Sequence, residues 1–406
     1  MRVYLDNSAS SRVCPEAVEA MLPYFSEKYG NPSSLHSFGV EAREGIERAR
    51  IQVARSIGAK PEEIIFTSGG TEGDNLALRG AVGTRKGGIV TTNIEHPAIL
   101  ETCKQVAADA GVSAAFVPVE FDGVVDAEKV AAAVDAGTSV VSVMAVNNEV
   151  GTIQPLSEVV SLCKQKNPNA LVHTDAVQAV GKIPVDVKKL DLDLLSLASH
   201  KFHGPKGVGA LYIREGVKLK PAMTGGGHER GLRSGTENVP GIVGMGIAAE
   251  LSVAHLEDDA SRAKRLRDTL IDGLLALPEA YLNGSREKRS AFNANFRFLG
   301  VEGESLLLML DSDGVAGSTG SACSSKKLQA SHVLMALGLK KWEAHGSLRL
   351  SLSRYTTREE AAYAMEAAKK AVERLRGMSP VWRKIVNEGK SSISDAGEDE
   401  HGEHVH

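Results

Sequence analysis

The sequence predicts an α/β protein with a large domain built on a doubly wound, mainly parallel sheet, and a smaller α+β domain. Three observations lead to this prediction. Short apolar runs alternate with helical segments between residues 64 and 213, the pattern changes after about residue 290, and 406 residues are too many for one simple core. Glycine is abundant, at 41 residues, which suits many tight turns between strands and helices.

The first half of the chain supplies the elements of the parallel sheet. Residues 1–12 predict a short strand and a turn, and residues 15–27 and 40–57 predict amphipathic helices. Sheet strands are expected at 64–67, 88–92, 140–146, 171–174, 193–198 and 210–213, with helices at 71–82, 97–110 and 156–166. Ligands of such sheets bind at the carboxyl ends of the strands, so the polar residues that follow each strand are candidate site residues.

The second half predicts a linking region and the smaller domain. Residues 238–277 predict one long helix or a broken pair, followed by strands at 293–298 and 347–353, an extended stretch at 315–318, and helices at 303–310, 326–337 and 357–376. We place the large domain at 13–255 and the small domain at 1–12 and 256–385. Residues 386–406 are expected to be a disordered, solvated tail, because 391–406 hold five acids and three histidines without Lys or Arg. Weak metal binding by this tail is the less favoured interpretation.

Composition excludes several classes of protein. A net charge of −4 argues against general nucleic-acid binding, and no apolar run approaches the roughly 20 residues that span a membrane. The N-terminus lacks the pattern of a signal peptide, so we expect a cytoplasmic protein. The four cysteines are widely separated, without metal-binding spacing, and are therefore expected to be free thiols with no firm metal site.

Lys201 is the first candidate for a chemical role. It follows the apolar run 193–198, stands next to His200, and precedes a glycine-rich stretch at 204–209. Most lysines are solvated surface charges, but a partly desolvated lysine can attack an aldehyde and form a Schiff base. The alternative is an ordinary lysine at the end of a strand.

Other strand ends carry groups of complementary chemistry. The turn at 68–72 is rich in small residues, as at helix N-termini that bind phosphate. His96 offers a flat imidazole for stacking on a planar cofactor, Asp175 could keep a pyridine nitrogen protonated, and Gln178 could donate to a ring oxygen. Each also has a structural interpretation: a tight turn with a Thr cap, a capping or core histidine, and a helix-capping aspartate.

Three further features suggest an amino-acid substrate and thiol chemistry. Asn148 follows a strand, although an Asn pair also suits a simple turn. Arg349 lies on an alternating strand, where its guanidinium could bind a carboxylate or form a structural ion pair. Cys323 stands in the Gly/Ser-rich stretch 314–325, which is expected to be mobile and to expose the thiol. The complete set is typical of a pyridoxal-phosphate enzyme that acts on an amino acid by thiol attack.

The motifs that decide the family are Thr67-Ser-Gly-Gly-Thr-Glu, Glu95-His, Val146-Asn-Asn-Glu-Val-Gly, Asp175-Ala-Val-Gln, Ser199-His-Lys, Gly225-Gly-Gly-His-Glu-Arg-Gly-Leu-Arg-Ser-Gly-Thr, Ser321-Ala-Cys-Ser and Arg349-Leu-Ser. By these motifs the sequence resembles the cysteine desulfurases, which are class V aminotransferases among the fold-type I pyridoxal-phosphate enzymes. The resemblance covers nearly the whole chain, from Tyr4 to about Trp382.

The resemblance implies a role for each candidate. Lys201 would hold pyridoxal 5′-phosphate, His96 would stack on its ring, Asp175 would pair with the pyridine nitrogen, and Gln178 would contact the ring hydroxyl. The implied phosphate cup consists of Gly70, Thr71, His200 and, from the partner subunit of a homodimer, Thr236. Asn148 and Arg349 would bind the substrate carboxylate. The implied catalytic residues are Lys201, His96 and Cys323.

The resemblance also implies the reaction and its partners. L-cysteine would become L-alanine, Cys323 would carry a persulfide, and the sulfur would pass to an iron–sulfur scaffold protein or a thiolation partner. Cys323 could also contact an iron–sulfur cluster held by that scaffold. A selenocysteine lyase, another class V aminotransferase activity and a non-catalytic docking protein are the alternatives. One departure is that Ala198 stands where the family often has a phosphate-binding serine, so Ser199 is a candidate substitute.

Overall fold

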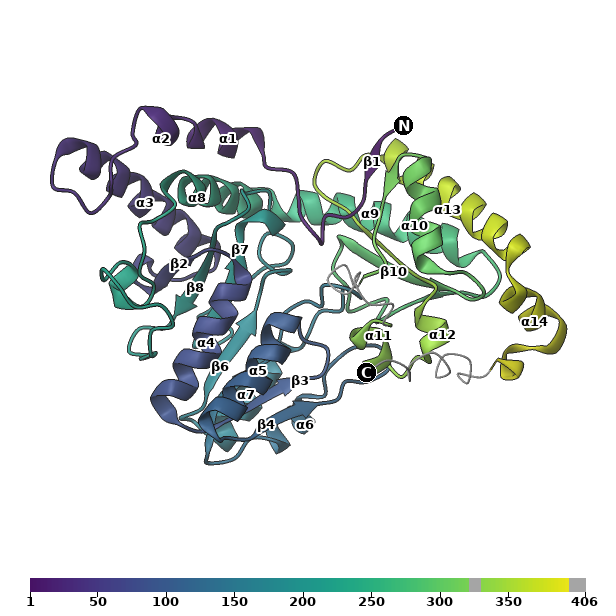
Figure 1. The fold of residues 1–406 in the computed structure, drawn as a ribbon, viewed down its shortest axis with the longest axis horizontal. Coiled ribbons are helices and arrows are strands. Elements are labelled where there is room, and N and C mark those ends of the chain that lie inside the picture. The colour runs from purple at the N-terminus through teal and green to yellow at the C-terminus, as the bar shows by residue number, and fades with distance from the viewer. Residues whose placement is uncertain (321–329, 394–406) are drawn as a thin grey trace, which may run out of the picture. The chain divides into compact units, whose positions relative to one another are not determined.

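The computed structural model describes residues 1–320 and 330–393 (Figure 1). It contains two compact units. The sheet unit consists of Asn7–Asn148 and Thr152–Ser261, and the small unit consists of Met1–Asp6, Glu149–Gly151 and the chain from Arg262 onwards. The domain limits that we expect from the sequence, 13–255 and 256–385, remain a prediction. The predicted tail lies mostly outside the described residues.

The sheet unit contains a seven-stranded sheet in the order β2-β8-β7-β6-β5-β3-β4. Its strands are β2 (Ile64–Thr67), β3 (Gly88–Thr92), β4 (Ala114–Val117), β5 (Thr138–Ser142), β6 (Leu171–Asp175), β7 (Leu194–Ala198) and β8 (Gly209–Ile213). Only β8 runs against its neighbours, and the other strands share one direction. The predicted α/β class with a mainly parallel sheet is confirmed.

Helices cover both faces of this sheet, because strand residues alternate between two apolar cores. Ile65 lies in the core under α4 (Gly70–Arg85) and α5 (Pro97–Ala110). Ile64 and Phe66 lie in the opposite core. That second core is covered by α1 (Pro15–Met21), α3 (Ser37–Ser56), α6 (Ala127–Ala132), α7 (Leu156–Lys166) and α8 (Val239–Ala254). Strands buried on both faces are typical of doubly wound sheets.

Six strands that share a direction place their carboxyl ends at one edge of the sheet. Four of these ends continue into the segments 68–71, 93–96, 176–178 and 199–201, which contain most of the predicted site residues. The edge matches the general rule for ligand sites in open α/β sheets.

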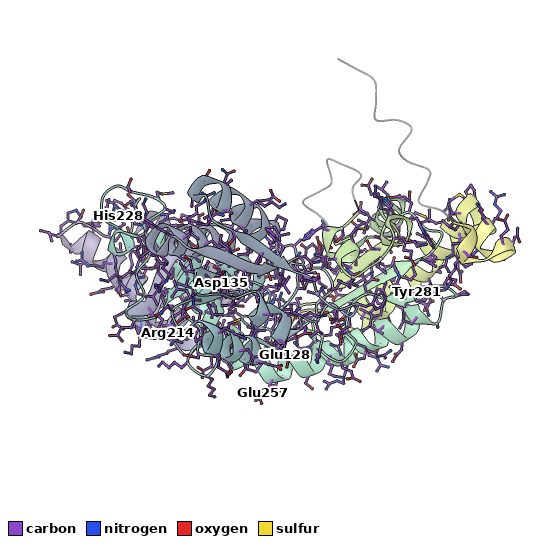
Figure 2. All side chains as sticks on the ribbon, turned by 90° about the horizontal axis from the view of Figure 1, so that it is seen from below. Glu128, Asp135, Arg214, His228, Glu257 and Tyr281 are labelled. Atoms are coloured by element: carbon purple, nitrogen blue, oxygen red, sulfur yellow. The ribbon has the colours of Figure 1, made fainter. Side chains whose placement is uncertain are left out.

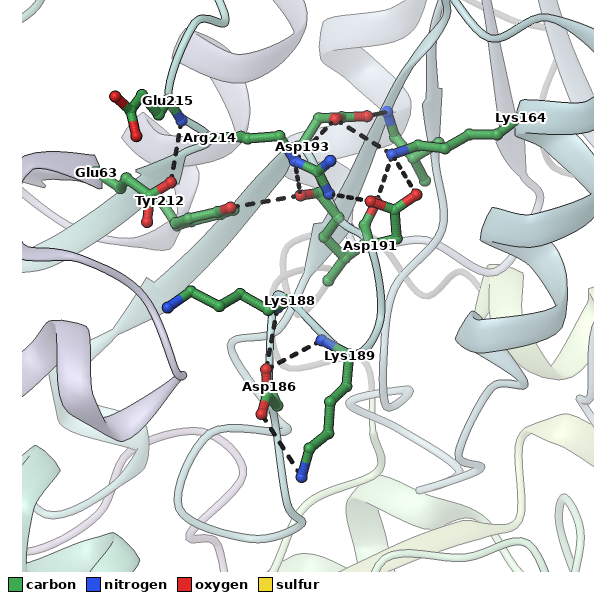
Figure 3. Close-up of polar contacts among 12 residues, drawn as sticks. Glu63, Lys164, Asp186, Lys188, Lys189, Asp191, Asp193, Tyr212, Arg214 and Glu215 are labelled. Carbon is green, nitrogen blue, oxygen red and sulfur yellow. Dashed lines mark hydrogen bonds and ion pairs between the residues drawn. The ribbon is translucent and has the colours of Figure 1, made fainter.

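Charged residues at the opposite edge have a structural role (Figure 3). Asp193, just before β7, accepts a hydrogen bond from the Val172 N–H at 2.9 Å and pairs with Arg214 and Lys164 at 3.2 and 3.3 Å. Arg214 also binds Asp191 at 2.6 Å. These contacts join β6, β7 and β8 at the ends remote from the predicted site.

The small unit has an antiparallel sheet in the order β12-β10-β9, formed by β9 (Ala280–Leu282), β10 (Asn293–Phe298) and β12 (Ser347–Ser351). A second, parallel pair joins β1 (Val3–Tyr4) to β11 (Val315–Ala316). Phe296, Phe298 and Leu350 pack in the core of the small unit with alanines of α13 (Arg358–Met378). Its helices are α10 (Gly303–Ser312), α11 (His332–Ala336), α12 (Lys341–Ala344), α13 (Arg358–Met378), α14 (Pro380–Glu388) and the larger part of α9 (Leu256–Leu275).

Several predicted elements differ in extent from the observed ones. The helix expected at 15–27 is broken into α1 and α2 (Pro23–Ser26), because Pro23 has no N–H to continue the first helix. Residues 238–277 form the broken pair, α8 and α9. Strand β5 ends at Ser142 rather than 146, and of the helix expected at 326–337 the described part is α11.

Within the described residues, no single helix is long and apolar enough to span a membrane. The bent pair α8 and α9 passes that test of length and composition only when both are taken together.

Candidate active site

Lys201 ends a single 3-10 turn, η2 (Ser199–Lys201), directly after β7. Its Nζ donates to two main-chain carbonyl oxygens, of Ser8 at 2.6 Å and of Ala9 at 2.8 Å. The segment that carries them is itself fixed, because Ser11 donates through its N–H and its Oγ to the His200 carbonyl, at 2.8 and 2.9 Å. The lysine is half-buried, and its amine is thus held in one place and partly removed from water.

Asp175 is the last residue of β6, the strand next to β7, and is buried. Its Oδ1 accepts a hydrogen bond from the Val177 N–H at 2.9 Å. Burial raises the pKa of Asp175, while interactions with His96 and then Lys201 act to lower it. These interactions place the carboxyl group near both residues and oppose the effect of burial.

His96 is the N-cap residue of α5, and its Nδ1 accepts a hydrogen bond from the Ala98 N–H at 3.1 Å. The capping interpretation of this residue is therefore confirmed. Because Nδ1 is an acceptor, a proton on the neutral ring must be at Nε2. Capping also fixes the direction of the ring, which stays half-buried at the carboxyl edge of the sheet.

Gln178 and His200 make contacts around the same N-terminal segment. Gln178 Nε2 donates to the Ser8 carbonyl at 2.9 Å, the oxygen that also accepts from Lys201. His200 Nδ1 lies 3.2 Å from Ser10 Oγ. Burial, together with the charge of Lys201, lowers the pKa of His200 to about 4, so this ring is neutral at pH 7.

The start of α4 has the features of a phosphate site. Among the described residues, no side chain caps this N-terminus, and a Cβ on Gly69 would meet no atom within 4 Å. A Cβ on Gly70 would come within 2.6 Å of Val177 Cγ2, so the helix can start this close to β6 only with glycine. Thr71 is exposed in the first turn. The open N–H groups of a 16-residue helix suit an anionic group.

Ser199 does not take the place that the sequence suggests for it. The Cβ of Ala198 lies 3.6 Å from the position of a Cβ on Gly70, so Ala198 faces the start of α4. Ser199 Oγ instead lies 1.9 Å from the position of a Cβ on Gly204, which also faces Ala248 of α8. Consecutive side chains at the end of a strand point to opposite faces, and the prediction of a phosphate contact by Ser199 is therefore not supported.

Four predicted site residues remain to be described. Asn148 is half-buried at the limit of the sheet unit, and Thr236 is exposed on the segment 223–236. Arg349 belongs to the small unit, where its Nη2 donates to Asp6 at 2.8 Å and its Nη1 to the Gly320 carbonyl at 3.3 Å. Cys323 lies outside the described residues.

The structure adds a buried polar group that sequence reasoning missed. Asp74 of α4 and His173 of β6 are both buried, with Oδ1 and Nε2 3.7 Å apart. The His173 nitrogens lie 2.9 Å from Ser142 Oγ and 3.0 Å from Ser196 Oγ. Burial lowers the pKa of His173 to about 3, and burial followed by the charge of Asp175 raises that of Asp74. His173 stands two residues before Asp175 and therefore on the same face of β6, and this spacing could have predicted that His173 belongs to the buried polar group.

Glu95 belongs to the same buried surroundings. Its Oε1 accepts from Thr92 Oγ1 at 2.7 Å and from the Met144 N–H at 2.9 Å. Burial raises its pKa to about 8. Burial raises the pKa of all three buried carboxyl groups, Asp74, Glu95 and Asp175, and only at Asp175 do His96 and Lys201 act against that rise.

Comparisons with known proteins agree with this geometry. The family model described as "Aminotransferase class-V" matches residues 3–363. The chain is 49% identical to "Cysteine desulfurase IscS" of Methanosarcina thermophila over 93% of this chain and 94% of that protein. It is 48% identical to the protein of the same name from Clostridium botulinum strain Hall, over 94% of this chain and 97% of that one. A solved structure titled "NIFS-LIKE PROTEIN" aligns with a TM-score of 0.86 and 44% identity, covering 92% of this chain and 99% of that one.

Proposed function

Because the chain belongs to the class-V aminotransferase family, we propose that it is a pyridoxal-phosphate-dependent cysteine desulfurase that collects sulfur on Cys323. The observation that carries this proposal is the fixed amine of Lys201, 2.6 and 2.8 Å from two carbonyl oxygens, at the sheet edge that also holds Asp175 and His96. The relatives named cysteine desulfurase cover nearly the whole chain, which favours this activity within the family.

The residues at this edge fit the cofactor. Lys201 would hold its aldehyde carbon, Asp175 would face the pyridine nitrogen, His96 would lie against the ring, and Gln178 would reach the ring hydroxyl. The glycines at the start of α4 leave open N–H groups for the phosphate, and Thr71 and His200 would contribute further contacts to it. When bound, pyridoxal 5′-phosphate supplies an electron sink that stabilises negative charge at the substrate Cα.

The chain itself supplies binding and proton transfer. Lys201 Nζ is the base that removes the proton from the substrate Cα. Asn148 and Arg349 bind the substrate carboxylate, which agrees with the planar, fixed guanidinium of Arg349. His200, which burial and the charge of Lys201 keep neutral, would contact the phosphate without adding charge to it, and His96, whose Nδ1 caps α5, would present its Nε2 side to the site.

Cys323 accepts the sulfur atom of L-cysteine. The thiolate of Cys323 attacks the sulfur of L-cysteine, an S–S bond forms, and the bond from that sulfur to Cβ breaks. Cβ keeps the electron pair, takes a proton and leaves as L-alanine, so the products are alanine and a persulfide on Cys323. The other three cysteines are buried, and burial raises the pKa of Cys103 to about 12 and of Cys163 to about 11, which disfavours either as the nucleophile.

The proposed partners and the proposed cellular location of the enzyme rest on its sequence. The enzyme would be a cytoplasmic homodimer in which Thr236 of each subunit completes the phosphate cup of the other. The exposure of Thr236 is compatible with such a contact. The persulfide would deliver its sulfur to an iron–sulfur scaffold protein or to a thiolation partner.

A single-turnover reaction with L-cysteine tests this function. Mass analysis of the peptide that contains Cys323 should show the gain of one sulfur atom, with alanine formed in equal amount. The Cys323→Ala variant should lose sulfur transfer, and Cys163→Ala serves as the matched control that keeps it. Alanine without sulfur on Cys323 would point to a lyase, and transamination products in cofactor-loaded protein would point to an aminotransferase.

A further inference from the structure

The segment 223–236 combines an exposed surface with one buried acid. Figure 2 shows His228 of this segment at the periphery of the sheet unit. Most of the segment is exposed, including Thr236 at its end, but Glu229 is 7% exposed. Glu229 and Arg230 both adopt left-handed backbone angles, with φ of +42° and +58°. Such conformations are unfavourable for residues other than glycine, and they persist where the surroundings hold them in place.

Arg50 of α3 holds Glu229 in this position. Its Nη1 and Nη2 donate to the two carboxylate oxygens of Glu229, at 2.9 and 2.8 Å, in a bidentate ion pair. The guanidinium is itself buried and lies 4.8 Å from the centre of the Phe66 ring. A bidentate pair fixes direction as well as distance, so the tip of the segment cannot rotate freely.

The ion pair also completes the edge of the sheet. β2 is one of the two edge strands, with β8 on one side only. On its outer side, the Ile64 carbonyl accepts from Arg50 Nη1 at 2.9 Å, and the Phe66 N–H donates to Glu229 at 2.7 Å. The side chains of Arg50 and Glu229 thus take the place of a neighbouring strand and attach the segment to the central sheet.

A second ion pair attaches the same segment next to the predicted phosphate site. Arg233 Nε donates to Glu72 at 2.9 Å, and Glu72 stands in the first turn of α4, beside Thr71. The Ser234 N–H donates to the Met223 carbonyl at 3.3 Å and closes the base of the segment. The two ion pairs and the hydrogen bond between Ser234 and Met223 therefore hold in place the residues that precede Thr236.

We infer that Arg50 and Glu229 are positioning residues that hold 223–236 as a rigid arm, which presents Thr236 to the cofactor phosphate of a second copy of the chain. This inference rests on the proposed function, because it needs both the homodimer and the cofactor. Arg50 and Glu229 touch neither substrate nor cofactor, and they act through the arm.

The first test compares Glu229→Gln with Glu215→Gln. Glu215 forms an exposed ion pair with Lys60 at 2.6 Å, and it follows β8, so it controls for a lost ion pair near the same sheet edge. In Glu229→Gln holoenzyme we expect trypsin to cleave after Arg230 or Arg233 at least tenfold faster, with Glu215→Gln unchanged. We also expect affinity for pyridoxal 5′-phosphate to fall at least tenfold, while affinity for pyridoxal, which has no phosphate, stays within twofold.

Removing one partner of a buried ion pair leaves the other charge unpaired and can prevent folding. If Glu229→Gln does not fold, the double variant Arg50→Met with Glu229→Met removes both charges and keeps apolar volume. The same cleavage and affinity changes are expected from it. Wild-type cleavage and phosphate-dependent affinity in a folded variant would overturn the inference.

Hybrid dimers of two differently tagged copies show which site the arm serves. When one subunit carries both Lys201→Ala and Glu229→Gln, the active lysine is in the wild-type subunit, and its cofactor should dissociate at least tenfold faster than in a hybrid with Lys201→Ala alone. When the two changes are on different subunits, no acceleration is expected. The opposite pattern, or no effect in either hybrid, would overturn the inference. A monomer in sedimentation would refute the dimer of the proposed function itself.

Discussion

The Nζ of Lys182 donates a 2.6 Å hydrogen bond to Oε1 of Gln178, and both side chains are buried. This bond decides which end of the amide faces the site, because Nε2 then donates to the Ser8 carbonyl at 2.9 Å. The same Ser8 oxygen accepts from Lys201 at 2.6 Å. One buried lysine thereby orients a side chain that shares an acceptor with the reactive amine.

We expect Lys182→Met to lower kcat about tenfold and to shift the visible absorbance of the bound cofactor, because the Gln178 amide loses the bond that fixes its orientation. Absorbance spectra and steady-state kinetics with L-cysteine measure both effects. Lys189→Met is the matched control, since Lys189 is an exposed lysine whose Nζ lies 3.7 Å from Asp186. Equal behaviour of the two variants would show that Gln178 does not depend on Lys182.

We expect Asp175→Asn to bind the cofactor and to lose activity by a factor of about one hundred or more, because an amide cannot keep the pyridine nitrogen protonated. Activity and cofactor absorbance should be measured on the same preparation. Asp109→Asn changes an exposed acid that lies 3.7 Å from Arg79 and should leave both unchanged. Full activity in Asp175→Asn would remove Asp175 from the proposed site.

Glu95 should make stability depend on pH. Burial raises its pKa from 4.5 to about 8 in the folded state, so its carboxyl group binds a proton more strongly when folded. Its contribution to stability is therefore full below about pH 4.5 and is lost as the pH rises towards 8. A shift of this size corresponds to an upper limit of about 5 kcal/mol.

The measurement for Glu95 is urea unfolding of wild type and Glu95→Gln at pH 5, 6.5 and 8, at one protein concentration. The free energy of unfolding of wild type should fall relative to that of Glu95→Gln as the pH rises, because glutamine does not titrate. A constant difference between the two proteins over this range would show that Glu95 is not protonated in the folded protein.

We expect Arg349→Lys to raise KM for L-cysteine about tenfold or more while cofactor absorbance stays unchanged, because an ammonium cannot make the planar, two-point contact of a guanidinium. Steady-state kinetics over a wide range of L-cysteine concentration separate KM from kcat. Arg286→Lys, at an exposed ion pair with Asp272 in the same unit, is the control. An unchanged KM would mean that the pair between Arg349 and Asp6 is purely structural.

Much of the fold was predictable because periodicity in apolar residues reports burial directly. Strands β2 and β3 and helices α5 and α7 have the predicted limits, since each begins at or directly after a Gly, Pro or charged residue. Strand β4 and helix α6 were not predicted. β4 lies at the edge of the sheet, where partly exposed residues such as Phe116 weaken the apolar signal.

The sequence by itself determined the fold class, the family and the chemical types at the strand ends, because these depend on local patterns and motifs. Only the tertiary structure decided the partners of those residues. It turned Ser199 away from α4 and placed Ala198 there, gave Lys201 the carbonyls of Ser8 and Ala9, and joined Arg50 to Glu229 across 179 positions. Such pairings depend on which strand edges and helix ends meet in space, and no local pattern in the sequence records that.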